Sequence, residues 1–162
     1  CLMPNHFHLM LEQLVDHGIQ KFMHKVLMGY VRYFNLKYDR VGRLYESSYK
    51  AKLLISDAQF SHLSRYIHLN PLDLFDKNWR EHGIKDWDLA MAFLDQYPWS
   101  SHHEFNGRHR GLPVIDDRYR GDLFAAPSEY REFLKEWGVG MENELENCGH
   151  SVTTVKNREI FQ

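Results

Sequence analysis

Two histidines flank one bulky apolar residue near the start of the chain, in His6-Phe7-His8, and an apolar run over residues 9–11 follows. Side chains of a β-strand alternate between its two faces, so this pattern predicts a strand over residues 2–12 with His6 and His8 side by side. Phe7 and the leucines that follow then pack against a core on the other face. An imidazole pair on a strand is half of a metal site, although two histidines at a strand end can also serve only as hydrogen-bonded or surface residues.

Charge is distributed unevenly along the chain. The 162 residues have a formal net charge of −2 and are 43% hydrophobic, which suggests one domain with a real core and, at most, an appendage. Residues 20–55 alone have a net charge of +6, whereas the C-terminal third is acidic. A basic segment inside a near-neutral chain suits a localised site for a polyanion.

Cellular location can be argued from what the sequence contains. Two distant cysteines, Cys1 and Cys148, do not make a disulfide scaffold, and the sequence shows neither a signal peptide nor an apolar stretch of membrane-span length. We therefore expect a cytoplasmic protein without a membrane partner. The chain opens without a methionine and runs straight into a strand, so we interpret it as a fragment whose upstream elements are absent.

Apolar periodicity predicts several further elements. Positions recurring in three- and four-residue steps predict an amphipathic helix over residues 19–38. Ser56 and Gln59 have the spacing of a capping box, which predicts a helix from residue 57 until Pro71 stops it. The remaining expectations are an extended segment over 44–55, a polar surface excursion over 76–88, short helices over 89–94 and 128–137, a turn and helix start over 97–101, and a weakly structured tail over 146–162.

Tyr66 and Asn70 are four residues apart on the predicted helix and therefore share one of its faces. A deprotonated phenol is a nucleophile, and an amide oxygen is a hard, neutral metal ligand. Together with the histidine pair, Asn70 would complete a three-ligand site with open positions for substrate oxygens. His62, one turn before Tyr66, is an auxiliary candidate. The alternative is that Tyr66 packs in the core and Asn70 caps the helix.

The basic segment is also rich in aromatic residues. Single-stranded nucleic acid is bound by this combination, in which cations contact phosphates and rings stack on bases. A solvated helix face beside ordinary core aromatics would have the same composition. If the segment does bind DNA, we expect the contacts to include Lys25, Arg32, Arg43, Tyr45, Lys50 and Lys52.

Four blocks in a fixed order give the chain a family resemblance. They are Pro4-Asn5-His6-Phe7-His8-Leu9-Met10-Leu11, Gly42-Arg43-Leu44-Tyr45 with Tyr49-Lys50-Ala51-Lys52, Leu63-Ser64-Arg65-Tyr66-Ile67-His68-Leu69-Asn70-Pro71, and Pro98-Trp99-Ser100-Ser101. Over residues 1–101 the sequence resembles the REP-associated tyrosine transposases, a branch of the single-tyrosine HUH transposases.

This resemblance implies an α+β, ferredoxin-like fold, with an antiparallel sheet, helices on one face, and an N-terminal strand, helix and strand missing from this chain. Residues 1–101 would form the catalytic domain and residues 102–162 a partly helical extension. By similarity, Tyr66 is the nucleophile, and His6, His8 and Asn70 bind Mg²⁺ or Mn²⁺.

The implied reaction is cleavage and rejoining of single-stranded or hairpin DNA at palindromic repeats through a 5′-phosphotyrosine. The implied setting is the bacterial nucleoid, and no small-molecule cofactor is expected. Two alternatives stay open: an inactive DNA-binding remnant of the same fold, and a metal-dependent hydrolase that uses water as nucleophile. Against the hydrolase, the sequence has no H-x-H-x-D run and no carboxylate beside the histidine pair.

Overall fold

A small sheet lies at the centre of the structure. The computed structural model describes residues 1–108, 115–116 and 123–136 and the backbone of residues 152–156. The strands stand in the order β1 (His8–Glu12), β3 (Val152–Lys156) and β2 (Lys50–Leu54). The helices within the described residues are α1 (Gly18–Lys37), α2 (Asp57–Leu69), the 3₁₀ helix η1 (Asn70–Leu74), α3 (Trp79–His82), α4 (Trp87–Gln96), α5 (His102–Phe105) and α7 (Pro127–Lys135). This mixture of helices and strands is consistent with the expected α+β class.

The strand directions differ from the expected antiparallel sheet, because β3 pairs in parallel with both β1 and β2. Helix α1 connects β1 to β2, and a helical crossover brings the chain back in its original direction. β1 and β2 therefore run the same way, with room for one strand between them. The crossover does not fix the direction of that middle strand.

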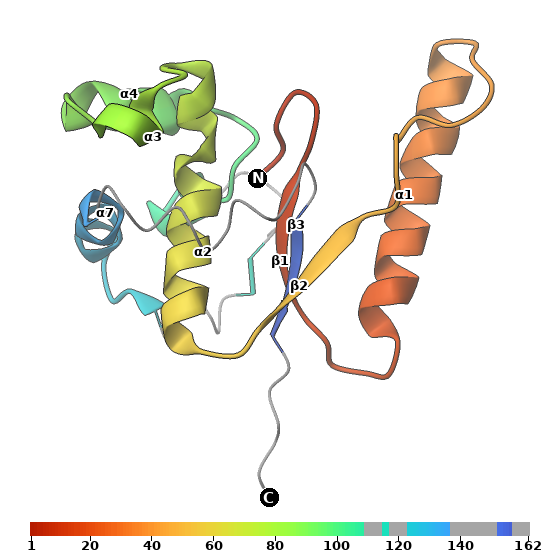
Figure 1. Ribbon diagram of the computed structural model, residues 1–162, viewed down its shortest axis with the longest axis horizontal. Coiled ribbons are helices and arrows are strands. Elements are labelled where there is room, and N and C mark those ends of the chain that lie inside the picture. The colour runs from red at the N-terminus through yellow and green to blue at the C-terminus, as the bar shows by residue number, and fades with distance from the viewer. Residues whose placement is uncertain (109–114, 117–122, 137–151, 157–162) are drawn as a thin grey trace, which may run out of the picture.

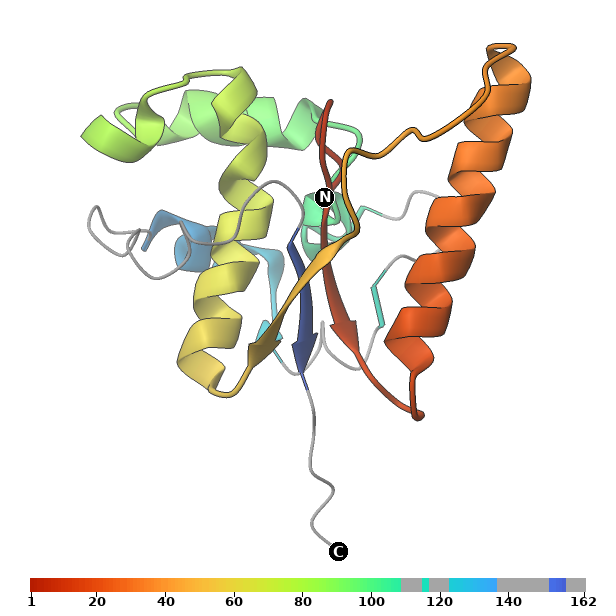
Figure 2. The same ribbon diagram turned by 45° about the vertical axis from the view of Figure 1, so that its right-hand side comes forward.

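The expectation of helices on one face is also wrong. Helices α1 and α2 lie on opposite sides of the sheet in both views (Figures 1 and 2). Ring contacts agree, since Phe7 packs on Tyr45, which packs on Tyr30 of α1, whereas His8 packs on Tyr66 of α2. Successive residues of an extended chain face opposite sides, so Phe7 and His8 each direct one ring to a different helix.

The two ends of the described chain meet in the sheet. Strand β1 begins at His8 rather than at residue 2, and before it Leu2 forms only an isolated antiparallel bridge with Phe7. Part of the expected weakly structured tail is strand β3, while the rest of residues 137–162 lies outside the described residues. The predicted extended segment over 44–55 contains a strand only in its second half, at Lys50–Leu54.

The predicted helix over residues 19–38 is confirmed as α1. Its apolar stripe is incompletely covered, because Met23 is buried while Phe22 is 44% exposed and Tyr30 is 48% exposed. No helix in the described part of the chain has both the length and the apolar character needed to span a membrane.

The predicted cap of α2 is also confirmed. The Ser56 hydroxyl accepts a hydrogen bond from the Gln59 amide at 3.2 Å. The Gln59 side chain accepts one from the Ile55 amide, one residue before its expected partner. The predicted end of the helix before Pro71 is confirmed as well, because α2 ends at Leu69 and the chain continues through Pro71 as the 3₁₀ helix η1.

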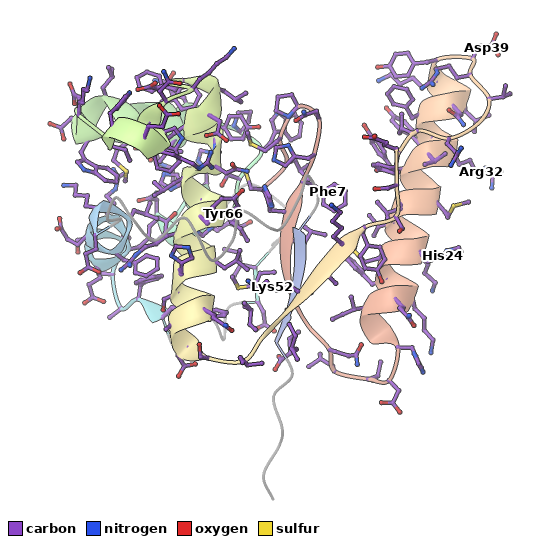
Figure 3. All side chains as sticks on the ribbon, in the orientation of Figure 1. Phe7, His24, Arg32, Asp39, Lys52 and Tyr66 are labelled. Atoms are coloured by element: carbon purple, nitrogen blue, oxygen red, sulfur yellow. The ribbon has the colours of Figure 1, made fainter. Side chains whose placement is uncertain are left out.

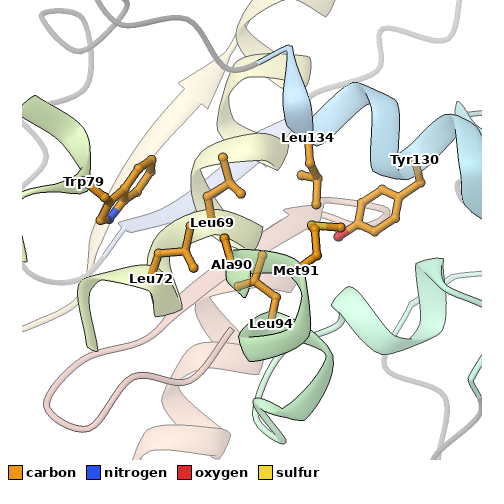
Figure 4. Close-up of a cluster of buried hydrophobic side chains, with 8 residues drawn as sticks. All are labelled: Leu69, Leu72, Trp79, Ala90, Met91, Leu94, Tyr130 and Leu134. Carbon is orange, nitrogen blue, oxygen red and sulfur yellow. The ribbon is translucent and has the colours of Figure 1, made fainter. Parts of the chain in front are cut away.

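The largest apolar core lies among the helices rather than on the sheet. Figure 4 shows its eight buried side chains, from α2, η1, α3, α4 and α7: Leu69, Leu72, Trp79, Ala90, Met91, Leu94, Tyr130 and Leu134. The expected surface excursion over 76–88 therefore contains a core residue, because Trp79 is 2% exposed. A second cluster, of Leu54, Leu63 and Ile67, joins β2 to α2.

A buried polar cluster joins α4, α5 and α7. His102 is fully buried, with Nε2 2.9 Å from Asp95 Oδ1 and Nδ1 2.8 Å from the Tyr130 hydroxyl. Arg131 donates two hydrogen bonds to the Asp95 carboxylate. Burial lowers the pKa of His102 to about 4, although the Asp95 carboxylate opposes this shift. His102 is therefore neutral at pH 7, and the cluster serves to hold the three helices together.

Candidate active site

Three of the predicted site residues stand together between β1 and α2. The imidazole centroids of His6 and His8 are 4.8 Å apart, and the His8 centroid is 5.4 Å from the Tyr66 ring. Figure 3 shows Tyr66 on α2 beside β1, with Phe7 pointing away from it toward α1. The alternation predicted for the strand therefore orients the histidines, although His6 precedes the first residue of β1.

His8 is the most unusual residue of the group. Its side chain is 2% exposed, and neither ring nitrogen has a hydrogen-bond partner among the described residues. Burial lowers its pKa to about 3, with smaller contributions from His6 and Arg80. Two unpaired nitrogens on a buried, neutral imidazole are costly unless something binds to them.

Asn70 completes the group from the end of α2. Its Nδ2 donates to His6 Nε2 at 3.3 Å, while His6 Nδ1 donates to the Asn5 side chain at 2.8 Å. Asn70 is 1% exposed and follows the last residue of α2, so the helix and the 3₁₀ turn fix its position. His62, the auxiliary candidate, is half-buried one turn before Tyr66 on the same helix.

Arg80 is a site residue that the sequence did not reveal. Its Nη2 donates to Asn70 Oδ1 at 2.9 Å, and its guanidinium carbon lies 5.2 Å from the centroid of the Tyr66 ring. Arg80 also forms an ion pair with Asp73, which accepts a hydrogen bond from the Trp79 indole at 2.7 Å. The position of Arg80 follows from burial of its neighbour Trp79 in the core, a tertiary contact without a local sequence signal.

The donor set can be tested for a divalent cation. His6 and His8 fit, because their rings are adjacent and the orphaned nitrogens of His8 need a partner. The amide oxygen of Asn70 accepts from Arg80 at one of its two lone pairs, so a cation on the other lone pair would lie close to the guanidinium charge. Within the described residues, no three His, Cys, Asp or Glu side chains form a metal-binding group.

The predicted DNA contacts are divided between the two sides of the sheet. Lys50 and His8 are both in register with Val152 of β3, so they lie on the same face, about 10 Å apart at the usual strand spacing. Lys52, two residues along β2, shares this face, where Leu54 packs against α2. These two lysines therefore lie on the side of the sheet that carries Tyr66.

The other four predicted contacts are on the α1 side. Lys25 and Arg32 are exposed on α1, and Arg43 is exposed in the loop that follows it. Tyr45 packs between Phe7 and Tyr30, with centroid distances of 6.4 and 6.5 Å. The six residues are close in the sequence, but they do not form one surface.

Residues 1–70 match the family model described as "Transposase IS200 like". The match covers His6, His8, Tyr66 and Asn70, ends where η1 begins, and supports the transposase family with DNA as partner. No curated protein and no solved structure gave a match.

Proposed function

We propose that the protein is a single-stranded DNA transesterase of the REP-associated tyrosine transposase type, with Tyr66 as nucleophile. The observation that carries this proposal is the 5.4 Å contact between the Tyr66 ring and the buried His8, inside the segment that resembles IS200-like transposases. A transposase of this type joins itself to DNA through the tyrosine. The other residues should then bind, orient and neutralise one phosphodiester.

The reaction exchanges one phosphate ester for another. The phenolic oxygen of Tyr66 attacks phosphorus in line with the 3′-oxygen, which leaves as its bond to phosphorus breaks. The phenol proton is lost to solvent, and the departing 3′-oxygen gains a proton to become a free 3′-hydroxyl. The protein then carries a 5′-phosphotyrosine, and another strand's 3′-hydroxyl reverses the step without an external energy source.

We propose that His6, His8 and the Asn70 oxygen bind Mg²⁺ or Mn²⁺, because imidazole with a neutral oxygen suits these ions. When bound, such a cation acts as a Lewis acid on a non-bridging phosphate oxygen. The chain's own contribution is to keep the His8 imidazole neutral, to place it beside His6 and to hold the Tyr66 ring against it.

We propose single strands and hairpins, including those of palindromic repeats, as substrates. Tyr66 lies between a helix and a strand, and a phosphodiester in a single strand can bend into such a site more easily than one in a stiff duplex. Lys50 is in register with His8 through Val152 of β3, and Lys52 shares the face of the sheet on which both lie.

The test uses Tyr66→Phe, which removes one hydroxyl and keeps the ring contact with His8. Wild type is incubated with 3′-labelled single-stranded hairpin DNA and Mn²⁺, and products are separated on a denaturing gel. Wild type should give a labelled protein–DNA adduct, and Tyr66→Phe should give none while binding the hairpin with nearly unchanged affinity. Tyr33→Phe, at an exposed tyrosine of α1, is the matched control and should form the adduct.

Each alternative has its own signature in this assay. Cleavage without an adduct, unchanged in Tyr66→Phe, would favour the hydrolase. Hairpin binding without cleavage or adduct would favour an inactive DNA-binding remnant.

A further inference from the structure

Arg80 is a cation built into the candidate active site. It comes from α3, outside the segment that matches the transposase model, and reaches back to residues of that segment. One guanidinium nitrogen donates to Asn70 Oδ1 and the other pairs with Asp73 Oδ1. The guanidinium also lies over the Tyr66 ring, at 5.2 Å from its centroid.

The guanidinium has unused capacity. Arginine has five N–H donors in a planar fork that matches two oxygens of a carboxylate or phosphate. Among the described residues, the Arg80 hydrogen bonds to Asn70 and Asp73 use two of these five donors, and the Arg80 side chain is 26% exposed. Its position is nevertheless fixed, because the adjacent Trp79 is buried in the core and donates to the same Asp73 oxygen.

We propose that Arg80 is the anion-binding group of this site, which takes a non-bridging oxygen of the reacting phosphodiester and holds the phosphorus beside Tyr66. This inference rests on the proposed function for the identity of the anion. Asp73 has a positioning role, since it holds the guanidinium through Nη1 while Nη2 donates to Asn70. The attack on phosphorus places negative charge on the phosphate oxygens, where a fixed guanidinium is most effective.

The same contacts couple the anion to the metal ligands. Arg80 donates to the same Asn70 oxygen that a divalent cation needs, so the guanidinium charge lies beside the cation and opposes its binding. A phosphate that pairs with Arg80 offsets this positive charge, and it adds negative charge close to the cation. Arg80 should therefore favour phosphate binding and disfavour cation binding when phosphate is absent.

The experiment measures both effects on the full chain. Inorganic phosphate is titrated into ¹⁵N-labelled protein while the arginine Nε–H resonances are followed, and Mn²⁺ affinity is measured separately without phosphate. The resonance that disappears in Arg80→Gln should be the arginine signal most displaced by phosphate in wild type. Arg80→Gln should weaken phosphate binding at least about tenfold and strengthen Mn²⁺ binding several-fold, by loss of a nearby positive charge.

Two variants complete the design. Lys77→Gln removes an exposed cation three residues away and should change either affinity less than about twofold. Arg80→Lys keeps the charge without the fork and should bind phosphate with intermediate affinity. A purely structural role for Arg80 would lower both affinities together or change neither, and either result would overturn the inference.

Failure of the proposed function gives a different result. Phosphate binding at Arg80 with no DNA adduct in wild type would support the anion site and refute the proposed transesterase activity. The opposite result would be normal adduct formation in Arg80→Gln together with no phosphate-induced shift of the Arg80 resonance in wild type. It would refute the anion site and support the transesterase activity.

Discussion

Replacing His8 by phenylalanine should stabilise the metal-free protein. His8 is 2% exposed and both of its ring nitrogens lack partners among the described residues. An unsatisfied buried polar group costs about 1–3 kcal/mol, and phenylalanine removes this cost while keeping the ring contacts with His6 and Tyr66. The slightly larger ring costs about 1 kcal/mol in packing. The net expectation is an increase of up to about 2 kcal/mol in the free energy of unfolding.

Divalent cation should reverse this order of stability. Binding to the folded state stabilises wild type by about 2.7 kcal/mol when the free ion is at 100 times its dissociation constant. His8→Phe has lost a ligand and should gain little. Urea unfolding at neutral pH, once with a chelator and once with Mn²⁺, gives both comparisons in one assay.

His103→Phe is the matched control, at a second buried histidine. His103 is 5% exposed, but its Nε2 donates to the Tyr97 carbonyl at 2.7 Å. Its replacement should lower the free energy of unfolding by about 1–3 kcal/mol, with or without Mn²⁺, because the carbonyl loses its donor. If His8→Phe destabilises the metal-free protein as much as His103→Phe does, the reasoning from unpaired nitrogens is refuted.

Two more predictions follow from the arrangement of charges. Neutralising Lys50 and Lys52 together should reduce the log–log slope of single-stranded DNA affinity against salt concentration by about 1.4, at about 0.7 per phosphate contact. Arg32→Gln, on the other side of the sheet, should leave this slope unchanged. Equal effects of the two changes on the slope would place the bound DNA elsewhere. Burial lowers the pKa of His102 to about 4, so between about pH 6.5 and pH 4 this histidine is protonated in the unfolded chain but neutral in the folded protein. The free energy of unfolding should therefore fall as the pH drops from about 6.5 toward 4. His102→Gln should reduce the slope of the free energy of unfolding against pH by up to about 1.4 kcal/mol per pH unit, whereas His24→Gln, at an exposed histidine, should leave it unchanged. An unchanged slope in His102→Gln would show that His102 is protonated in the folded protein.

Local patterns in the sequence predicted the parts of the fold that depend on local interactions. The apolar period predicted α1, and the pair Ser56 and Gln59 predicted the start of α2. Strand alternation and the four-residue helical step predicted that His6 and His8 would be adjacent and that Tyr66 would approach them. Neighbouring residues were sufficient for α1, for the start of α2 and for the histidine pair, whereas a shared site with the distant Tyr66 was implied by the family resemblance.

Elements held by distant contacts could not be predicted in this way. Trp79 and Arg80 belong to a four-residue helix in a polar stretch, and only packing against α2 and α4 shows why the tryptophan is buried. Strand β3 is five residues long and pairs with segments about a hundred or more residues earlier. The direction of β3 and the division of the basic residues between two faces also depend on how the sheet is assembled.

The most direct test of the account identifies the residue that carries DNA. The adduct formed with single-stranded hairpin DNA and Mn²⁺ is digested with nuclease and trypsin, and the peptides are analysed by mass spectrometry. Cleavage after Arg65 and Lys77 releases the peptide 66–77, in which Tyr66 is the only tyrosine. The expected result is a nucleotide attached through its 5′-phosphate to Tyr66 in this peptide. A nucleotide on any other peptide, or cleaved DNA with no modified peptide, would contradict it.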